Sequence, residues 1–496
     1  MAHSTHQVSS EFPLLRENAY LNGQWVLAET GACFAVINPA TGETLANVPD
    51  MNQADTCRAI DAATAAWPAW RALTAKERAG LLRRWFDLIM ANQEALARLM
   101  TAEQGKPLKE ARGEVAYGAS FVEWFAEEAK RAYGDVIPGH GPDKRIMVIK
   151  QPIGVVAAIT PWNFPIAMMT RKVGPALAAG CPVVVKPAED TPLCALALAE
   201  LAEQAGIPPG VLNVVTCSKA QAPDIGKTLT THPEVRKVTF TGSTPVGKLL
   251  MSQASSTVKK VSLELGGNAP FIVFDDADLD AAVAGLMASK YRNTGQTCVC
   301  ANRVYVQSGV YQAFSEKLAD AVAKLVVGAG LEGDTDQGPL INQAALDKVK
   351  AHVQDATDKG ASILCGGTPQ SLEGLAGCFY TPTILTGVTQ NMQIAKAETF
   401  GPVAPLFQFE TEAEAVVMAN DTEFGLAAYF YSNNVQRIGR VAEALETGIV
   451  GINEGIISTE VAPFGGIKES GLGREGSHYG LDEFMELKYL CMGGMQ

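Results

Sequence analysis

Two cysteines, Cys298 and Cys300, stand one residue apart in the segment YRNTGQTCVCAN, which runs from residue 291 to residue 302. A zinc site needs three or four ligands, and no histidine or further cysteine stands nearby, so we expect no metal here. A disulfide is disfavoured, because residues two apart on an extended segment have Cα atoms about 6.5–7 Å apart, the upper limit of disulfide geometry. Two uses stay open: a nucleophile beside the accessible turn at residues 295–297, or small packing side chains.

A carboxylate and an amide also stand where chemistry is possible. Glu264 lies near the end of the apolar segment KKVSLEL and is followed by two glycines. An acid in such a place is usually paired, but an unpaired one would have a raised pKa and could act as a general base. Asn163 lies in TPWNFP, between two prolines. Its amide is either an ordinary turn group or a rigidly fixed donor to an oxyanion.

Two segments suggest a dinucleotide site. In VTFTGSTPVGK, a Gly242-Ser243 turn joins an expected strand to an expected helix, whose N-terminal amides favour a phosphate. The spacing is not G-x-G-x-x-G, so an ordinary turn stays open. In VVKPAED, Lys186 and Glu189 follow a buried strand, where they would either bind ribose hydroxyls or form a solvated loop. A thiolate, an amide donor, a carboxylate and a dinucleotide together suit oxidation of an aldehyde through a thioester.

The elements that carry these residues alternate between strands and helices. We expect strands within residues 181–190, 211–216, 236–242, 259–265, 269–274 and 303–307, and helices within 191–206, 243–254 and 278–291. Thr191 is expected to cap its helix, with Pro192 in the first turn and Gly206 at the end. Residues 75–100 suggest amphipathic helices, and residues 145–154 an extended hairpin arm. The pattern predicts an α/β fold with a parallel sheet covered on both faces.

Composition narrows the class of protein. The 496 residues carry a formal net charge of −13, which argues against a nucleic-acid partner. No run of about 18 apolar residues exists, and residues 1–20 do not read as a secretory signal, so we expect no membrane association. The ten cysteines are too few and too scattered for a disulfide scaffold, which favours a reducing, cytoplasmic setting.

Seven ordered segments give the chain a clear resemblance. It resembles the NAD(P)-dependent aldehyde dehydrogenase superfamily over nearly its whole length, through TPWNFP (160–165), VVVKPAE (183–189), FTGSTPVG (240–247), LELGG (263–267), GQTC (295–298), ETFGPV (398–403) and PFGGIKESGLGREG (463–476). Within the superfamily it is most similar to the succinate-semialdehyde and glutarate-semialdehyde dehydrogenase branch. That closer match lies in EQGKPLKEARGEV (103–115), TRKVGPALAAG (170–180), RNTGQTCVCANR (292–303) and NEGIISTEVAPFGG (453–466).

The resemblance implies roles for the residues above. Cys298 would be the nucleophile, Asn163 and the Cys298 backbone N–H would hold the oxyanion, and Glu264 would activate the water that hydrolyses the thioester. The cofactor would be NAD, with NADP possible, because a carboxylate at 189 accepts from ribose hydroxyls and repels a 2′-phosphate. The cofactor contacts implied are Thr160, Trp162, Lys186, Glu189, Gly242, Ser243, Leu265, Glu398 and Phe400.

The branch also implies an anionic substrate. Arg171, Arg292 and Ser458 match its carboxylate-binding residues, and arginine binds carboxylates bidentately. Succinate semialdehyde is the first expectation, with glutarate semialdehyde and 3-sulfolactaldehyde as alternatives. Cys300 would be a redox neighbour that forms a reducible disulfide with Cys298.

The expected architecture is an aldehyde dehydrogenase-like fold. A Rossmann-like cofactor domain would span residues 1–130 and 151–263, and an α/β catalytic domain residues 264–460. Residues 131–150, a β-hairpin arm, and 477–496 would pair with a second subunit in a dimer or tetramer. Two other classes are possible on this scaffold. One is a non-catalytic binding protein, which Cys298, Glu264 and Asn163 together argue against. The other is an enzyme that transfers the thioester to coenzyme A, and relatives of that kind tend to lack a glutamate at 264.

Overall fold

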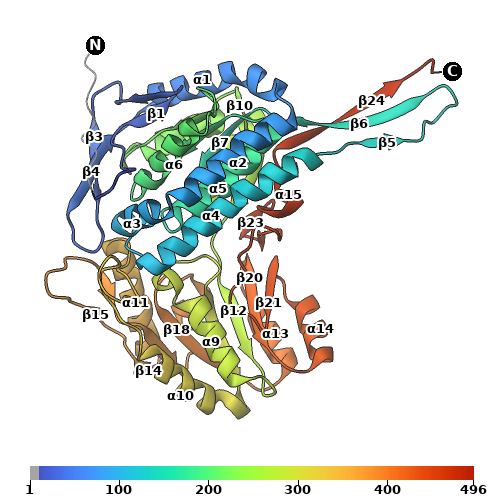
Figure 1. The fold of residues 1–496 in the computed structure, drawn as a ribbon. Helices are drawn as coiled ribbons and strands as arrows, with labels where there is room; N and C mark the ends of the chain where they lie inside the picture. Colours follow the sequence, from blue (N-terminus) through green and yellow to red (C-terminus); the bar gives the residue numbers. More distant parts are fainter. Residues whose placement is uncertain (1–10, 496) are drawn as a thin grey trace.

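The computed structural model describes residues 11–495 and has two bodies and a projecting arm (Figure 1). Residues 1–10 and 496 lie outside the described residues. The expected lack of a secretory signal rests partly on them, and two of the predicted domain segments end there. Within residues 11–495, no helix is long and apolar enough to span a membrane.

The first body is built on an eight-stranded sheet in the order β2-β1-β9-β8-β7-β10-β11-β23. The strands from β9 to β11 in this order are parallel, and the others pair antiparallel. The bounds are β1 (Ala19–Leu21), β2 (Gln24–Val26), β7 (Val155–Ile159), β8 (Val183–Lys186), β9 (Leu212–Val214), β10 (Val235–Thr241), β11 (Lys260–Glu264) and β23 (Gly471–Leu472). The expected parallel α/β sheet is therefore confirmed.

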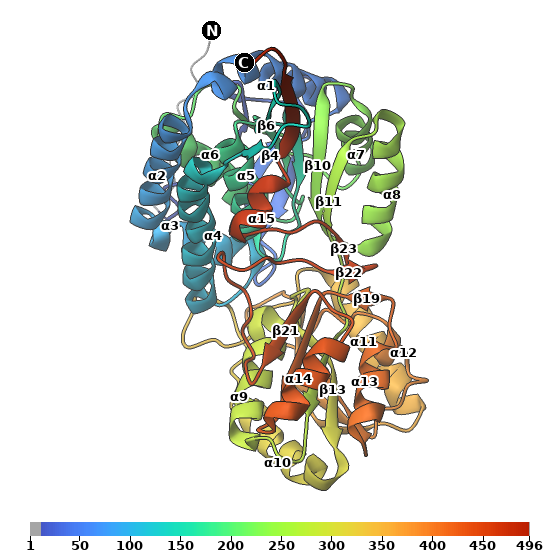
Figure 2. The ribbon, with the colours of Figure 1, turned by 90° about the vertical axis from the view of Figure 1, so that its right-hand side faces the viewer.

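Alternate residues of the central strand β7 face different helices, as the period of two requires. Val156 and Ala158 belong to the core with α2 to α6, whereas Val155 and Ala157 belong to the core with α1 and α7. The helices of this body are α1 (Gln53–Ala72), α2 (Ala75–Ala91), α3 (Gln93–Gln104), α4 (Leu108–Glu128), α5 (Pro165–Ala179), α6 (Pro192–Gln204), α7 (Ala222–Thr231), α8 (Thr244–Ala254) and α15 (Ser477–Asp482). Figure 2 shows α2, α3 and α4 on one side of the body and α7 and α8 on the other.

The second body holds a seven-stranded sheet in the order β14-β17-β18-β13-β12-β20-β21. Its strands are β12 (Ala269–Val273), β13 (Ala301–Gln307), β14 (Ser362–Cys365), β17 (Thr383–Thr386), β18 (Val403–Phe409), β20 (Ala427–Tyr431) and β21 (Ile449–Ile452). Its helices are α9 (Leu279–Lys290), α10 (Tyr311–Val322), α11 (Gln343–Asp358), α12 (Gln393–Lys396), α13 (Glu412–Asn420) and α14 (Val435–Ala444). Three short antiparallel pairs complete the fold: β3 (Cys33–Ile37) with β4 (Thr44–Pro49), β15 (Pro369–Gln370) with β16 (Phe379–Tyr380), and β19 (Phe424–Gly425) with β22 (Ile467–Lys468).

The arm is a three-stranded sheet of β5 (Asp135–Ile137), β6 (Arg145–Pro152) and β24 (Met485–Met492), which projects from the first body and carries the C-terminal end (Figure 1). The expected hairpin is present. The C-terminal segment adds a strand to β6 of its own chain, since β24 pairs antiparallel with β6 along its whole length. Pairing of this arm with a second subunit stays a prediction.

One local expectation was wrong. Thr191 stands at the N-cap position of α6 but makes no side-chain cap, and its hydroxyl has no hydrogen-bond partner. The buried carboxylate of Glu103, at the end of α3, instead accepts hydrogen bonds from the amides of Leu193 and Cys194 at 2.8 Å each. Burial raises the pKa of Glu103 to about 7, although those hydrogen bonds oppose the rise. A tertiary contact has replaced the local cap.

The chain passes between the two sheets where β11 ends at Glu264 and β12 begins at Ala269. We therefore propose that the cofactor domain ends at residue 263 and that residues 264–460 form the catalytic domain. The later strand β23 returns to the edge of the first sheet, so Gly471–Leu472 extend that sheet.

Candidate active site

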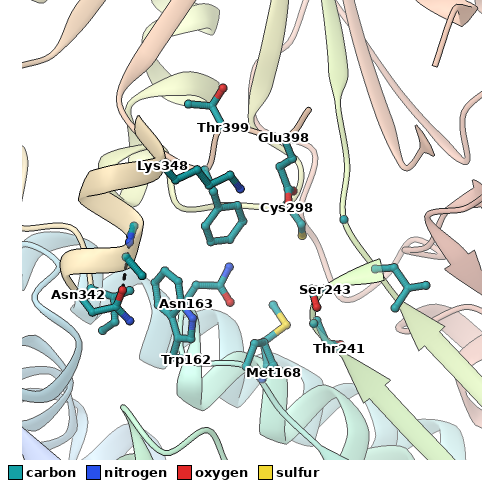
Figure 3. Close-up of a pocket in the computed structure, with 18 residues that line it drawn as sticks. Trp162, Asn163, Met168, Thr241, Ser243, Cys298, Asn342, Lys348, Glu398 and Thr399 are labelled. Carbon is teal, nitrogen blue, oxygen red and sulfur yellow. Dashed lines mark hydrogen bonds between the residues drawn. The ribbon is translucent and has the colours of Figure 1, made fainter. Parts of the chain in front are cut away.

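A cavity of about 350 Å³ lies between the two bodies (Figure 3). Its lining comes from the ends of β7, β10 and β11 on one side and from the Cys298 loop, α11 and residues 398–400 on the other. Figure 3 shows Asn163 and Cys298 in the same cavity, with Glu398 beside Cys298. The cavity brings together eight of the predicted residues: Trp162, Asn163, Gly242, Ser243, Leu265, Cys298, Glu398 and Phe400.

The Cys298 loop follows a short turn of 3₁₀ helix, η3 (Arg292–Gly295). Asn293 and Thr294 have φ values of 52° and 56°, a left-handed conformation that is costly for non-glycine residues and persists only where the surroundings enforce it. Here the Thr294 hydroxyl donates to the Gly338 carbonyl at 3.1 Å, and the Tyr429 hydroxyl donates to the Val299 carbonyl at 2.7 Å. The loop that carries the thiol is therefore held on both sides.

Close backbone approach fixes the position of the nucleophile candidate. Gly267 lies against it, and a Cβ at that position would stand 2.3 Å from the Cys298 carbonyl oxygen, so only glycine fits. The Gly267 amide in turn donates to Glu398 Oε1 at 3.0 Å. The second glycine of LELGG is thus explained by packing.

The two neighbouring thiols differ in their surroundings. Cys298 is partly exposed to the cavity, whereas Cys300 is buried and its thiol donates to the Ser289 carbonyl oxygen at 3.2 Å. Burial raises the pKa of Cys298 to about 12, although Arg171 lowers it. The thiol therefore needs a base or a positive charge beside it before it can attack.

Hydrogen bonds hold both the side-chain amide and the backbone carbonyl of Asn163. Its Nδ2 donates to the Gln296 carbonyl oxygen at 3.0 Å, which leaves one N–H of the amide free, and its Oδ1 is buried without a partner. Its own carbonyl oxygen accepts from Lys106 Nζ at 2.7 Å and from Asn293 Nδ2 at 3.0 Å. A side chain held this way can offer one donor to an oxygen at the Cys298 side without reorganising.

A buried ion pair supports the Asn163 loop. Lys106 and Glu114 form a direct pair with side chains at most 1 % exposed. The other oxygen of Glu114 accepts from the amides of Ile166 and Ala167 at 3.0 and 3.3 Å, at the start of α5. Because such a pair costs desolvation energy, its full set of hydrogen bonds is what makes it tolerable. Sequence reasoning missed both residues, although they lie in the segment EQGKPLKEARGEV.

Glu264 ends β11, and within residues 11–495 neither of its carboxylate oxygens has a hydrogen-bond partner. Of the two alternatives that the sequence left open for Glu264, the structure favours the unpaired acid. Burial raises the pKa of Glu264 well above its ordinary value, and the nearby Glu475 carboxylate raises it further, against Arg171 and Lys172. An acid with a raised pKa beside a reacting group is suited to proton transfer near neutral pH.

Arg171 and Lys172 form ion pairs with Glu475 rather than with Glu264. Its carboxylate accepts from Arg171 Nε and from Lys172 Nζ, and Lys172 Nζ also donates to the Thr241 hydroxyl at 2.6 Å. Burial opposes ionisation, but these two cations hold the pKa of Glu475 below its ordinary value. Sequence reasoning missed Glu475 and Lys172, although both lie in segments that carried the resemblance.

Arg171, Arg292 and Ser458 meet in a small side pocket that opens at Cys298. Arg171 is buried and packs over the Phe464 ring at 4.2 Å, and Arg292 lies 5.3 Å from the centre of the Phe164 ring. Since Arg171 Nε is bound to Glu475 while its Nη2 has no partner, the terminal edge of the guanidinium is what faces a ligand. No carboxylate lines this pocket among the described residues.

The other predicted cofactor contacts lie beside the main cavity rather than in it. Thr160 and Lys186 stand at the ends of adjacent strands, joined by a backbone hydrogen bond of 3.1 Å. Lys186 and Glu189 form an ion pair at 3.6 Å, and Glu189 lines a separate hollow with Asn342.

The donor set fits a dinucleotide. Ser243 precedes α8 without a side-chain cap, so the first-turn amides, except at Pro245, which has no N–H, stay available for a phosphate. The Trp162 and Phe400 rings meet edge to face, with centroids 5.6 Å apart, and line the cavity beside Glu398. The same cavity is thus lined by two aromatic rings that can contact a flat ring, by the Glu398 carboxylate and by the N-terminus of α8.

Comparison with known proteins gives consistent relatives. The sequence pattern described as the aldehyde dehydrogenase family matches residues 25–490. A glutarate-semialdehyde dehydrogenase of Pseudomonas aeruginosa is 64% identical over 482 residues, covering 97% of this chain and 99% of that protein. An NADP(+) succinate-semialdehyde dehydrogenase of Escherichia coli (strain K12) is 62% identical, covering 97% and 98%. The crystal structure of a succinate-semialdehyde dehydrogenase from Burkholderia pseudomallei superposes with a TM-score of 0.95 at 62% identity, covering 97% and 98%.

Proposed function

The chain belongs to the aldehyde dehydrogenase family, and on that premise we propose that its substrate is a small aldehyde with an anionic far end. The chain is an oxidoreductase that uses NAD(P) to oxidise an aldehyde to an acid. Succinate semialdehyde is the first choice of substrate, and glutarate semialdehyde and 3-sulfolactaldehyde are the alternatives. The observation that carries the proposal is the pair of guanidinium groups, Arg171 and Arg292, in a pocket that opens at Cys298.

The proposed mechanism uses three side chains of this chain. The Cys298 thiol loses its proton to solvent in the cavity, and its sulfur attacks the aldehyde carbon while the free N–H of the Asn163 amide and the Cys298 backbone N–H receive the developing oxyanion. The α8 N-terminus, Glu398 and the Trp162 and Phe400 rings would hold a bound NAD(P), which would accept the former aldehyde hydrogen as hydride and so leave the Cys298 thioester. Glu264 then takes a proton from the water that cleaves the Cys298 thioester, which releases the acid and the thiol. The raised pKa of Glu264 suits this exchange of protons.

The first test compares kcat/KM for succinate semialdehyde, glutarate semialdehyde, 3-sulfolactaldehyde and an uncharged aldehyde of similar length. We expect one anionic aldehyde to exceed the uncharged one by about a hundredfold, which corresponds to about 3 kcal/mol. Arg292→Met should remove most of that preference, and Arg58→Met, at a half-exposed position on α1, should leave it intact. Arg171→Met is a less clean test because it also removes one of the two cations bound to the Glu475 carboxylate. Equal rates with charged and uncharged aldehydes would overturn the proposal.

We further propose that NAD is preferred to NADP. Glu189 is partly exposed beside Lys186, and a carboxylate there accepts from ribose hydroxyls and repels a 2′-phosphate. The Escherichia coli relative carries NADP(+) in its name, so the choice has to be measured on this chain. Glu189→Ser should raise kcat/KM for NADP relative to NAD by at least about tenfold, a change of 1.4 kcal/mol, whereas Asp190→Asn, next to it, should not. A higher kcat/KM with NADP in the parent would contradict the proposal.

The proposed assembly is a dimer or tetramer in the cytoplasm. The support is the arm, on which Tyr133, Val136, Leu487 and Tyr489 are all more than half exposed, as expected for an apolar surface that a partner covers. Sedimentation of the full chain would measure the state, and a monomer at micromolar concentration would contradict it.

A further inference from the structure

Tyr117 lines the side pocket of Arg171, Arg292 and Ser458, although sequence reasoning did not single it out. It lies in the middle of α4, which packs closely against α5, the helix that carries Arg171. The Tyr117 ring meets the Phe121 ring edge on, with centroids 5.0 Å apart, and packs on the Phe164 and Met168 cluster. The ring is thus held by apolar contacts, and the hydroxyl group extends beyond them.

The hydroxyl group of Tyr117 is buried and forms no hydrogen bond of ordinary geometry within the described residues. The comparable buried hydroxyls of Tyr291 and Tyr429 donate to carbonyl oxygens at 3.0 and 2.7 Å. An unpaired buried hydroxyl costs free energy, so in a native protein it needs an explanation. Local packing supplies none, because Phe would make the same ring contacts.

The groups around this hydroxyl point to an anion. Burial raises the pKa of Tyr117, whereas Arg171 and Arg292 lower it, Glu475 raises it, and the Ser458 hydroxyl lies close enough to lower it. Arg171 Nη2, in the same pocket, is also unpaired. Two cations, Arg171 and Arg292, and the hydroxyls of Tyr117 and Ser458 therefore converge, and no carboxylate lines the pocket with them among the described residues.

We propose that Tyr117 is a further binding residue for the substrate, whose phenol O–H donates to the carboxylate or sulfonate group held by Arg171 and Arg292. This inference rests on the proposed function, because it deepens the specificity of the same pocket. The phenol O–H forms a hydrogen bond to an acceptor oxygen, so it strengthens the binding of a carboxylate or sulfonate group and not that of an uncharged alkyl end. It also explains why a phenol rather than a phenyl ring stands there.

Tyr117→Phe is the test, since it removes one oxygen atom and keeps the ring. We expect KM for the preferred anionic aldehyde to rise about ten- to hundredfold, the range of a hydrogen bond to a charged group. kcat should stay within about twofold, and KM for the uncharged aldehyde should not change. The inhibition constants of the dianions succinate and glutarate should rise by the same factor as KM for the anionic aldehyde.

Unliganded stability separates a binding role from a structural one. Because the Tyr117 hydroxyl is unpaired, Tyr117→Phe should unfold at the same or a higher temperature than the parent. Tyr311→Phe is the matched control, because its hydroxyl donates to the Leu406 carbonyl at 3.3 Å and accepts from the Gly387 amide. That control should lose stability and keep its KM values.

Three results would overturn the inference. They are an unchanged KM for the anionic aldehyde, an equal rise in KM for charged and uncharged aldehydes, and a loss of stability in Tyr117→Phe that matches the Tyr311→Phe control. If Tyr117→Phe has no effect while Arg292→Met removes the anionic preference, Tyr117 is not a binding residue and the proposed function stands. If neither variant changes the preference, the proposed function fails as well.

Discussion

Two buried carboxylates near the active site, Glu114 and Glu264, have opposite surroundings. Glu114 is bound by Lys106 and by two backbone amides under the Asn163 loop. Glu264 has no hydrogen-bond partner, and its pKa is raised by burial and by Glu475. The first carboxylate stabilises a position, while the second keeps its oxygens available for a proton or a water.

The same division extends to their neighbours. The region under the Asn163 loop, namely Lys106, Glu114 and Asn293, forms a connected hydrogen-bond network with the Asn163 carbonyl. The catalytic side holds unpaired buried atoms on Asn163, Arg171, Glu264 and Tyr117. Unpaired buried atoms also occur elsewhere among the described residues, but these four side chains line or border the cavity and its side pocket, and we infer that a ligand completes them. The predictions below test this contrast.

The largest effect is expected from Glu264→Gln on the catalytic side. Removing a general base should slow turnover by about 10²–10⁴-fold, with the Cys298 thioester accumulating as a burst of reduced cofactor. Stopped-flow absorbance at 340 nm measures both. In the parent, kcat should rise with pH through the raised pKa of Glu264, and that rise should be absent in the variant. A variant with parental turnover would remove Glu264 from the mechanism.

Glu264→Gln should also change stability, and in the opposite direction. The folded-state pKa of Glu264 lies above the unfolded value, so the folded protein binds this proton more tightly than the unfolded chain does. The free energy of unfolding therefore falls as pH rises above about 4.5, the ordinary pKa of a glutamate. The variant should therefore be more stable than the parent at pH 8–9, and the gap should close toward pH 5. Thermal unfolding at several pH values measures this.

Lys106→Met tests the hydrogen-bond network under the Asn163 loop. It leaves the Glu114 carboxylate buried without its cation, which should cost about 3–5 kcal/mol in the free energy of unfolding. Lys109→Met is the matched control, because Lys109 is exposed in its pair with Asp336, and it should cost less than about 1 kcal/mol. Urea unfolding measures both variants. Equal, small losses would mean that the pair under the Asn163 loop is not important for stability.

Asn163→Ala tests the boundary between the two regions. Its carbonyl oxygen, held by Lys106 and Asn293, is unchanged by the substitution, whereas the amide donor is lost. We expect kcat to fall by about 10²–10³-fold, the effect of removing one oxyanion donor, with the unfolding temperature close to that of the parent. A fall of less than about threefold in kcat would contradict the assigned role.

The smallest effect on turnover is expected from Cys300→Ala, since the Cys300 thiol is turned to the Ser289 carbonyl oxygen. Reduced enzyme should keep kcat/KM within about twofold of the parent, since a ΔΔG‡ below about 0.5 kcal/mol is expected for a group outside the reaction. In the proposed switch, peroxide would oxidise the Cys298 thiol to a sulfenic acid, and the Cys300 thiol would displace water from it to form a disulfide that thiols reduce. Without Cys300, excess peroxide would oxidise the sulfenic acid further to a sulfinic acid, which thiols do not reduce. After excess peroxide, activity should therefore return with dithiothreitol in the parent and in Cys365→Ala, and should not return in Cys300→Ala. If it returns equally in all three, the pair is not a redox switch.

Local sequence patterns determined most of the scaffold. The apolar run at 181–190 and the helical segment at 191–206 became β8 and α6, and residues 75–100 became α2 and α3. These predictions hold because strand and helix periods are local properties of the chain. The N-cap of α6 was wrong for the converse reason, since Glu103, which replaces Thr191 there, comes from a different helix.

The chemistry divides in the same way. The sequence by itself, through its motifs, pointed to Cys298, Asn163, Glu264, Arg171 and Arg292 as residues of one site, and the structure places Cys298 and Asn163 in one cavity and both arginines in a pocket that opens at Cys298. Only the tertiary structure decided which carboxylate is paired: Glu475 takes Arg171 and Lys172, and Glu264 is left free. Pairing and pKa depend on the distance to charges from other elements and on the exclusion of water, and neither is a property of a short segment of sequence.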